Sequence, residues 1–314
     1  MVVFHGIHKL ADEFKGAVVT LGVYDGLHRA HMSILERVMV AAEERHVRSL
    51  LITFNPHPRN FFLENDEQVK LLTTSPEKIA LLQDTALDGI LLLTVDRELL
   101  NTDSRAFVES VLVDKLRISK VIVGYDYHFG RARGGHAEQL LDYGGQWGFD
   151  VEIVPPIFLD QEPVRSSYIR SLLARGDVER STKFLNRFYS LRGKIVHGSG
   201  RGRRLGFPTA NIAVESSDKM VPADGIYLTR CRVNGRRYFG MCNVGTRRTF
   251  DETERIPEVH LLDAGTPELY GSDIEVSFLE RLRDEKKFGS ADELVRQMHQ
   301  DEKECRTRIE KYKL

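Results

Sequence analysis

The first half of the chain alternates short apolar runs with segments of helical periodicity. Five runs are apolar nearly throughout and rich in β-branched residues: AVVTLGV (17–23), VRSLLITF (47–54), GILLLTV (89–95), KVIVG (120–124) and DVEIVP (150–155). Strands that are buried on both faces of a parallel sheet show this pattern. Because helical segments separate the runs, the pattern predicts an α/β domain built on a doubly wound parallel sheet.

Several helices can be placed within this half. Thr74 and Glu77 predict a capping box, and Pro76 favours the first helical turn. Residues 167–187 predict two short helices. A single apolar helix face is predicted from five residues, Phe107, Val108, Val111, Leu112 and Leu116.

Beyond residue 188 the pattern changes to alternating strands, such as LRGKIVHG, GIYLTRCRV, RRYFGMCNV and DIEVSFLE. These predict an antiparallel barrel or sandwich. A final helix is expected from Ser290, with Glu293 completing a capping box and an apolar stripe along the helix. A chain of 314 residues suits two domains, and we place them at 1–186 and 187–314.

Composition narrows the class of protein. The chain is 41% hydrophobic and 29% charged, which excludes large-scale disorder, and its formal net charge of −1 favours small-molecule partners over nucleic acid or a membrane surface. Cys231, Cys242 and Cys305 form no CxxC pair, so we expect reduced thiols. With neither a signal pattern nor a run of roughly 18 apolar residues, we expect a cytoplasmic protein.

The segment TLGVYDGLHRAH (20–31) joins the first of these strands to a helix. Gly22, Asp25 and Gly26 predict a tight turn, and His28 and His31 share one helical face. Phosphates favour this junction because backbone N–H groups and the positive end of the helix dipole meet there. The alternatives are a pair of surface histidines or a zinc site, but no third ligand has a diagnostic spacing.

A second candidate site lies in GSGRGRRLGFPTANI (198–212). The glycines do not follow G-x-G-x-x-G, so a dinucleotide fingerprint is excluded. The basic residues could contact phosphates, or could simply form a solvated loop. Thr209 and Asn211 project to the same side of an extended chain and offer neutral oxygens that suit Mg²⁺. Glu258 and His260 share a face of a later strand, which could equally be an ordinary amphipathic strand.

At the level of motifs, the N-terminal half resembles the bifunctional bacterial riboflavin kinase and FAD synthetase family. GVYDGLHRAH is similar to the family's G-x-F-D-G-x-H-x-G-H, with Ala30 at the last glycine, and TFNPHP (53–58), VGYDYHFG (123–130) and RSSYIRSLLARGDV (165–178) follow in order. Ser167 stands where the family has threonine. The resemblance implies an adenylyltransferase site in which ATP is bound by Gly22, Asp25, His28, His31, Ser166, Ser167 and Arg170, with His57 and Asp126 lining the flavin and nucleotide pocket.

Residues 188–312 resemble the riboflavin kinase domain of the same family through GRRLGFPTANI, NVGTRRTF, EVHLLDAGTPELYG and LRDEKKFGSADEL, with Arg248 at a usual proline. The resemblance implies a six-stranded Greek-key barrel with a C-terminal helix. Glu258 would be the catalytic base, and Thr209 and Asn211 would hold Mg²⁺. ATP would be bound in this domain by Gly200, Arg204, Gly206, Pro208 and Asn243.

The implied activity is phosphorylation of riboflavin to FMN by ATP and Mg²⁺ in the C-terminal domain, followed by adenylylation of FMN to FAD in the N-terminal domain. One alternative is a monofunctional riboflavin kinase, because Ala30 replaces the signature glycine. Another is a regulatory protein that binds a flavin or nucleotide and meets RNA through its basic loop, which would need an extended basic face with exposed aromatics. We expect a monomer or a weak homo-oligomer.

Overall fold

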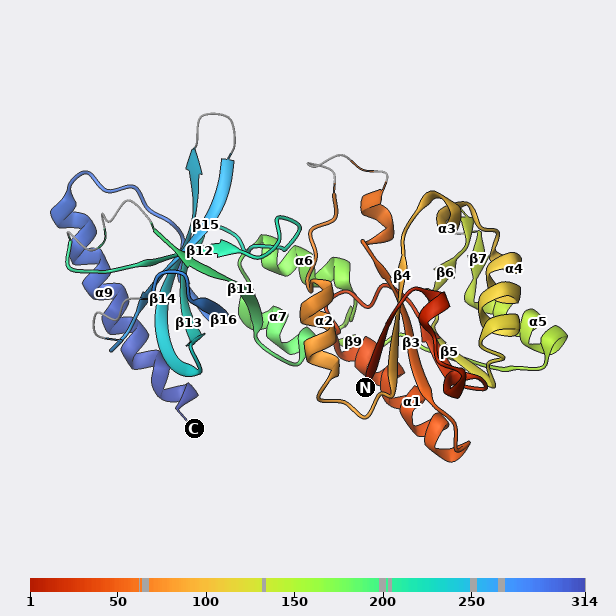
Figure 1. Cartoon of the computed structure of the whole chain (residues 1–314). Helices are drawn as coiled ribbons and strands as arrows, with labels where there is room; N and C mark the ends of the chain where they lie inside the picture. Colours follow the sequence, from red (N-terminus) through yellow and green to blue (C-terminus); the bar gives the residue numbers. More distant parts are fainter. Residues whose placement is uncertain are drawn as a thin grey trace. The chain divides into compact units, whose positions relative to one another are not determined.

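The computed structural model describes residues 1–61, 63, 68–131, 134–197, 202, 205–248, 253–264 and 269–313. It divides into two compact units, residues 1–166 and 167–314 (Figure 1). This division falls earlier than the functional boundary expected at 186/187, which stays a prediction.

The first unit is built on a six-stranded parallel sheet. Its strand order is β1-β4-β3-β2-β5-β8, and every neighbouring pair is parallel. The strands are β1 (Val2–His5), β2 (Val18–Leu21), β3 (Ser49–Asn55), β4 (Gly89–Thr94), β5 (Lys120–Gly124) and β8 (Asp150–Val154). The five expected strands and the parallel sheet are therefore confirmed, and β1 is an additional edge strand.

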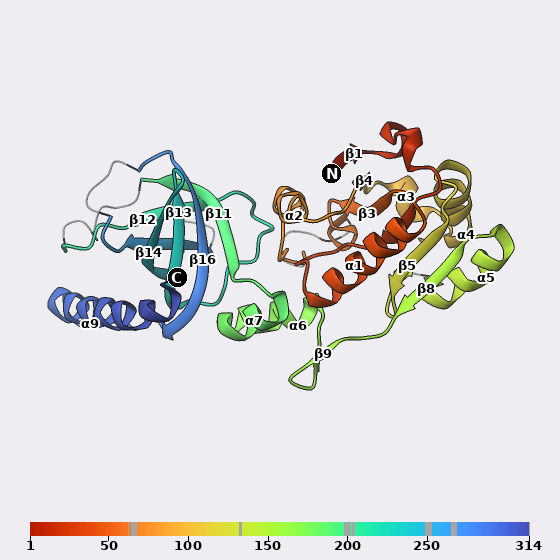
Figure 2. The ribbon, with the colours of Figure 1, turned by 90° about the horizontal axis from the view of Figure 1, so that it is seen from below.

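Helices cover both faces of this sheet (Figures 1 and 2). One face packs against α1 through Ile34, Leu35 and Val38, and the other packs against Phe14, Leu112 and Leu140. The remaining elements of this unit are α1 (Arg29–Glu44), α2 (Ser75–Leu82), α3 (Arg97–Asn101), α4 (Ser104–Phe107), α5 (Ala137–Trp147), η1 (Ile7–Lys9), η2 (Asp12–Phe14), η3 (Pro58–Phe61), the π-helix η5 (Val108–Lys115), and the hairpins β6 (His128–Phe129) with β7 (Gly135–His136) and β9 (Phe158–Leu159) with β10 (Glu162–Pro163).

The local helix signals are largely confirmed. Thr74 accepts a hydrogen bond from Glu77 N, and the Glu77 carboxylate accepts one from Thr74 N, so the expected capping box opens α2. The apolar face predicted over residues 107–116 is buried at Phe107, Val108, Leu112 and Leu116, with Val111 partly buried. Its backbone differs from the expectation, because α4 runs directly into the π-helix η5.

The second unit carries a closed antiparallel barrel, as the alternating pattern predicts. The strands follow one another around the barrel in the order β11-β12-β15-β14-β13-β16. They are β11 (Tyr189–Val196), β12 (Ala210–Val214), β13 (Gly225–Val233), β14 (Arg236–Arg248), β15 (Thr253–Leu261) and β16 (Asp273–Arg283), accompanied by α6 (Ser166–Ala174), α7 (Val178–Leu185), α9 (Ala291–Ile309) and η7 (Glu310–Tyr312).

Helix α9 is joined to the barrel by a buried apolar cluster and by buried charges. Cys305 and Ile309 pack against Ile226, Leu228 and Leu279. The helix begins after Ser290, whose hydroxyl accepts a hydrogen bond from Glu293 N as expected. The second half of the predicted capping box is wrong, because the Glu293 carboxylate accepts from Gly289 N, one residue before the cap.

Two carboxylates, one on α9 and one on β16, hold α9 against the barrel. Asp301 of α9, which is 2% exposed, accepts hydrogen bonds from Arg283 Nε and Nη2 of β16. Conversely, Glu280 of β16 accepts from Arg308, Lys311 and Tyr312. Because each side supplies a carboxylate to hydrogen-bond donors of the other, the C-terminal helix is fixed against β16.

All three cysteines lie in this second unit as buried free thiols. Burial raises the pKa of Cys231 and of Cys305 to about 12, and burial also raises that of Cys242 well above its ordinary value. The expected reduced thiols are confirmed. None of the helices in the described part of the chain has the length and apolar composition needed to cross a membrane.

Candidate active sites

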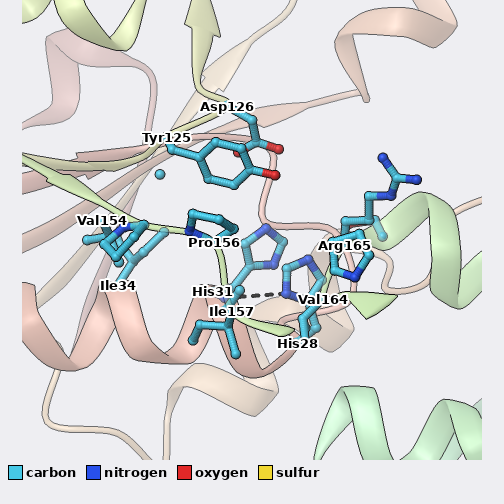
Figure 3. A pocket seen from close by; sticks show the side chains of 15 residues that line it. His28, His31, Ile34, Tyr125, Asp126, Val154, Pro156, Ile157, Val164 and Arg165 are labelled. Atoms are coloured by element: carbon cyan, nitrogen blue, oxygen red, sulfur yellow. Dashed lines mark hydrogen bonds between the residues drawn. The ribbon is translucent and has the colours of Figure 1, made fainter. Parts of the chain in front are cut away.

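The described pocket of the first unit opens at the carboxyl ends of the parallel strands (Figure 3). Strand order reverses direction between β2 and β5, so the chain leaves these two neighbouring strands toward opposite faces of the sheet. Ligands bind in the crevice at such a switch point. The pocket is lined by the start of α1 and by the segments that follow β5 and β8: His28, Ala30, His31, Ile34, Gly124, Tyr125, Asp126, Val154, Pro155, Pro156, Ile157, Pro163, Val164, Arg165 and Ser166.

His28 and His31 form one stacked unit in this pocket. Their ring centroids lie 3.6 Å apart with the planes inclined by 15°, and the Tyr24 ring lies 4.6 Å from that of His31. His28 is the N-cap of α1, and its Nδ1 accepts a hydrogen bond from His31 N at 3.3 Å. Because Nδ1 accepts, the proton of this ring resides on Nε2, which is therefore a hydrogen-bond donor.

The turn before His28 is fixed by Asp25. Its carboxylate is 4% exposed and accepts hydrogen bonds from Leu72 N at 3.1 Å and Thr73 N at 2.9 Å. Thr73 Oγ1 accepts one from Gly26 N, and Ser166 Oγ donates one to the Asp25 carbonyl. Asp25 thus joins the turn to a distant segment of the chain rather than lining the pocket.

The structure brings only some of the expected adenylyltransferase residues together. Among the described residues the pocket gathers His28, His31, Asp126 and Ser166, whereas Gly22, Asp25 and His57 do not line it. Gly22 instead leaves room for the Tyr24 ring, since a Cβ there would lie 3.0 Å from it. His57 Nδ1 accepts from Arg59 N. Ser167 and Arg170 lie on α6 in the second unit, so their expected pyrophosphate contacts stay predictions.

Tyr125, Pro156 and Arg165 line the same pocket and were not anticipated. Figure 3 shows the Tyr125 ring beside Pro156, with the Arg165 guanidinium directed away from the two histidines. An available signal was the position of these residues directly after or beyond the ends of β5 and β8, because parallel strands bring their carboxyl ends to one edge.

In the barrel, Asn211, Glu258 and Asn243 form a row across three strands. Glu258 of β15 is paired with Asn211 of β12 on one side and with Asn243 of β14 on the other. Directly opposed residues of antiparallel strands project to the same face, with Cβ atoms roughly 4.5–5.5 Å apart. The row shares its face with Ile226 and Met241, which belong to the cluster that packs against α9. On this face of the barrel, Glu258 therefore lies between the side-chain amides of two asparagines.

The segment before Asn211 is held by two histidines. Phe207 is buried, and its ring packs edge-on against His260 of β15 at 5.3 Å and His299 of α9 at 4.8 Å. His260 Nδ1 lies 2.9 Å from the Pro208 carbonyl, which can only accept, so Nδ1 carries the proton. Helix α9 therefore helps to place the segment that carries Thr209.

Glycines allow the chain to fold closely at this point. A Cβ on Gly202 would lie 2.4 Å from the Phe207 carbonyl and 3.1 Å from Thr209 Oγ1, and Gly206 has a φ of +87°, a region that favours glycine. The expected ATP-binding residues Gly200 and Arg204 lie outside the described residues, as do Arg201 and Arg203.

The oxygen donors at this end of the barrel fit the magnesium ion that was expected from the sequence. Asn243 Oδ1 is a buried oxygen with no hydrogen-bond partner among the described residues, and Thr209 and Asn211 add further neutral oxygens. Mg²⁺ prefers oxygen ligands and usually keeps phosphates in its coordination shell. Within the described ranges, no group of three or more His, Cys, Asp or Glu residues could hold a metal ion.

Comparison with known proteins assigns each unit. The FAD synthetase family model matches residues 10–168, and the riboflavin kinase family model matches residues 185–309. The bifunctional riboflavin kinase/FMN adenylyltransferase of Pseudomonas fluorescens is 34% identical over 309 residues, which is 96% of each chain. The chain belongs to the bifunctional riboflavin kinase/FMN adenylyltransferase family. The Bacillus subtilis member is 30% identical over 305 residues, covering 96% of this chain and 95% of its own.

A solved structure shares the fold of this chain along nearly its whole length. It is described as a macrolide-efflux protein from Streptococcus pneumoniae, with a TM-score of 0.89 and 28% identity over 98% of this chain and 99% of the other. The curated relatives and the two family models confirm, over nearly the full length, the family resemblance inferred from short motifs. The closed barrel coincides with the riboflavin kinase match.

Proposed function

We propose that the chain converts riboflavin to FMN in its barrel and FMN to FAD at the pocket of its parallel sheet, using one ATP in each step. The observation that supports both assignments is the presence of two separate polar sites, one beside each family motif. The stacked His28 and His31 lie at the sheet's switch point, and Glu258 lies between two asparagines in the barrel.

In the kinase step Glu258 acts as the general base. Its carboxylate accepts the proton of the ribityl 5′-hydroxyl as that oxygen forms a bond to the γ-phosphorus of ATP; the bond from the γ-phosphorus to the β–γ bridging oxygen breaks, and ADP leaves. Asn211 and Asn243 flank the carboxylate and can donate their amide hydrogens to the hydroxyl or the phosphate. Mg²⁺, held by Thr209 and Asn211, would neutralise charge on the ATP phosphates.

In the adenylyl-transfer step the protein supplies hydrogen-bond donors. A phosphate oxygen of FMN attacks the α-phosphorus of ATP, the bond from the α-phosphorus to the α–β bridging oxygen breaks, and pyrophosphate leaves. His28 Nε2 donates a hydrogen bond to the phosphates, while Arg165 adds a positive charge at the same pocket. Ser167 and Arg170 of α6 would bind the leaving pyrophosphate.

Location, assembly and partners follow from the composition and the proposed activity. We place the enzyme in the cytoplasm as a monomer or weak homo-oligomer with small-molecule partners, and the near-neutral charge of −1 speaks against nucleic acid as a partner.

The test incubates the full-length protein with riboflavin, Mg²⁺ and ATP and separates FMN from FAD. Glu258→Gln keeps the shape of the side chain without its basicity, so FMN formation should fall about 10²- to 10⁴-fold, while adenylylation of supplied FMN stays at the parent rate. A Glu258→Gln variant that retains more than about a third of the kinase rate would remove Glu258 from the role of base.

His28→Asn is the matched variant for the other site. Asparagine is a good N-cap, so α1 keeps its start while the imidazole donor is lost. We expect FAD formation to fall about 10²- to 10³-fold with FMN formation unchanged. A parent that forms FMN but no FAD would establish the monofunctional kinase, and a parent that forms neither would support the regulatory protein.

A further inference from the structure

The loop between β2 and α1 has an unusual backbone. Tyr24 has a φ of +51° and Leu27 a φ of +40°, on either side of Gly26 at +88°. Residues other than glycine rarely adopt the left-handed backbone region, and such conformations persist only where surrounding contacts fix them. His28, the first residue after this loop, depends on it for its position as the N-cap of α1.

One contact point of the loop is the carbonyl of Val23. It accepts a hydrogen bond from Thr53 Oγ1 at 3.0 Å and a second from Lys78 Nζ at 2.5 Å. Lys78 Nζ also donates to Thr53 Oγ1 at 3.0 Å, so the three groups form a closed triangle. Thr53 comes from β3 and Lys78 from α2, and neither lines the pocket.

Lys78 is an unusual residue for such a place. It is 4% exposed, and burial lowers its pKa to about 8, although the nearby Asp25 carboxylate acts in the opposite direction. Asp25 is itself fixed by the backbone of Leu72 and Thr73, and the neighbouring Glu77 is engaged at the N-cap of α2. A buried ammonium is unfavourable unless it is hydrogen-bonded and compensated by an opposite charge. Both conditions are met here, because the Val23 carbonyl and Thr53 Oγ1 accept hydrogen bonds from the ammonium and the Asp25 carboxylate supplies the opposite charge.

We infer that Lys78 is a positioning residue for adenylyl transfer, holding the Val23 carbonyl so that the loop presents His28 to the nucleotide phosphates. The inference rests on the proposed function of the first unit. Lys78 does not line the pocket, and acts through the backbone of residues 23–28. A small displacement of a donor that stabilises charge in the transition state lowers the rate of the chemical step more than it weakens binding.

Lys78→Met in the full-length protein removes the ammonium and keeps an unbranched apolar side chain. FAD formation from FMN and ATP should show a kcat about 10- to 100-fold below the parent, with the KM for ATP changed less than about threefold. FMN formation serves as the internal measure of protein quality, because it occurs in the barrel. Thermal unfolding is recorded for each variant, and kinetics are measured well below the transition.

Lys120→Met is the matched control. Lys120 is the first residue of β5, at the amino ends of the strands, whereas the loop follows the carboxyl end of β2. It pairs with Glu152 at 2.6 Å, so its loss removes a lysine ion pair of the same unit without touching the loop. It should leave the kcat for FAD formation within about twofold of the parent. A kcat for Lys78→Met that is also within about twofold would overturn the inference, as would an equal loss in both variants.

A second variant keeps the test decisive if Lys78→Met does not fold. Thr53→Val is nearly isosteric and removes one of the two donors to Val23 while leaving the ammonium in place. It should lower the kcat several-fold at an unchanged KM, and an unchanged kcat would contradict the inference. A parent that forms no FAD would instead refute the proposed function itself, so the two failures are distinct.

Discussion

At the scale of single residues, Ala30 is the position where the chain departs most directly from the motif of its family. It lines the pocket together with His28 and His31, where the family signature has glycine. Its methyl group occupies space that a nucleotide could otherwise approach. The position therefore tests how closely ATP lies against the start of α1.

If the methyl crowds the nucleotide, Ala30→Gly lowers the KM for ATP in FAD formation and leaves FMN formation unchanged. The removal of one helix-favouring residue costs the first turn of α1 about 0.5–1 kcal/mol, which is too little to unfold the domain. Steady-state kinetics of both reactions are the measurement. An unaltered or weaker FAD-forming activity shows that the pocket already accommodates the methyl group.

At the scale of elements, the attachment of α9 to the barrel depends on Glu280. Burial by itself would raise the pKa of this carboxyl, but hydrogen bonds from Arg308, Tyr312 and Lys311 lower it below its ordinary value of 4.5. A carboxylate whose pKa is lower in the folded state stabilises that state at pH values above its unfolded pKa. The stabilisation is lost as the pH falls through the lower, folded value.

Acidification below about pH 4.5 should therefore loosen α9 in the parent more than in Glu280→Gln. At pH 7 the variant should lose about 1.5–3 kcal/mol of unfolding free energy, because it gives up hydrogen bonds to charged donors. Denaturant titrations at several pH values measure both effects. Glu310→Gln is the control, since its pair with Lys313 is exposed and worth at most about 1 kcal/mol. An equal pH dependence in Glu280→Gln and the parent would refute this account.

At the scale of the whole molecule, the separability of the two activities is the main expectation. A fragment of residues 184–314 contains the whole barrel, α9 and the proposed kinase residues, and some 130 residues suffice for an independent core. It should unfold cooperatively and form FMN but no FAD. A soluble but molten fragment, or a folded one that cannot make FMN, would show that the boundary is functionally wrong.

The structure favours an earlier first residue for the isolated kinase fragment. The Arg281 side chain of β16 donates a hydrogen bond to the Arg175 carbonyl, and its backbone N–H donates one to the Glu179 carboxylate. Ala223 N donates to the Leu173 carbonyl. Residues 167–186 are thus fastened to the barrel. A fragment of residues 167–314 should melt at a higher temperature than 184–314, whereas equal melting temperatures would show that α6 and α7 add no stability to the barrel.

Features that depend on neighbouring residues could be predicted from the sequence, whereas features that depend on distant contacts could not. Strands β2, β3, β4, β5 and β8 were predictable because each is an apolar run, while β1 was missed because only four residues pair and only Phe4 is fully buried. The π-helix η5 was missed because its buried residues also fit a regular helical spacing.

The candidate sites divide in the same way. His28 and His31 could be paired from a spacing of three, since a helical turn is a local constraint. The hydrogen-bond partners of Asp25 could not be predicted, because Leu72 and Thr73 are remote from it in sequence, and its expected contact with ATP stays a prediction. The adjacency of Glu258 to Asn211 and Asn243 likewise depends on strand register, which alternation alone does not determine.

The three buried cysteines allow the opening of the second unit to be followed by thiol labelling. A thiol reagent needs both access and a thiolate, and the closed structure denies Cys231, Cys242 and Cys305 both of these. Alkylation of the native protein should therefore proceed only as fast as the barrel opens around Cys231 and Cys242, or as α9 separates from it and exposes Cys305. Since all three thiols lie in one unit, the labelling rate should follow the opening of the kinase barrel even in a mixture where the other domain has already unfolded.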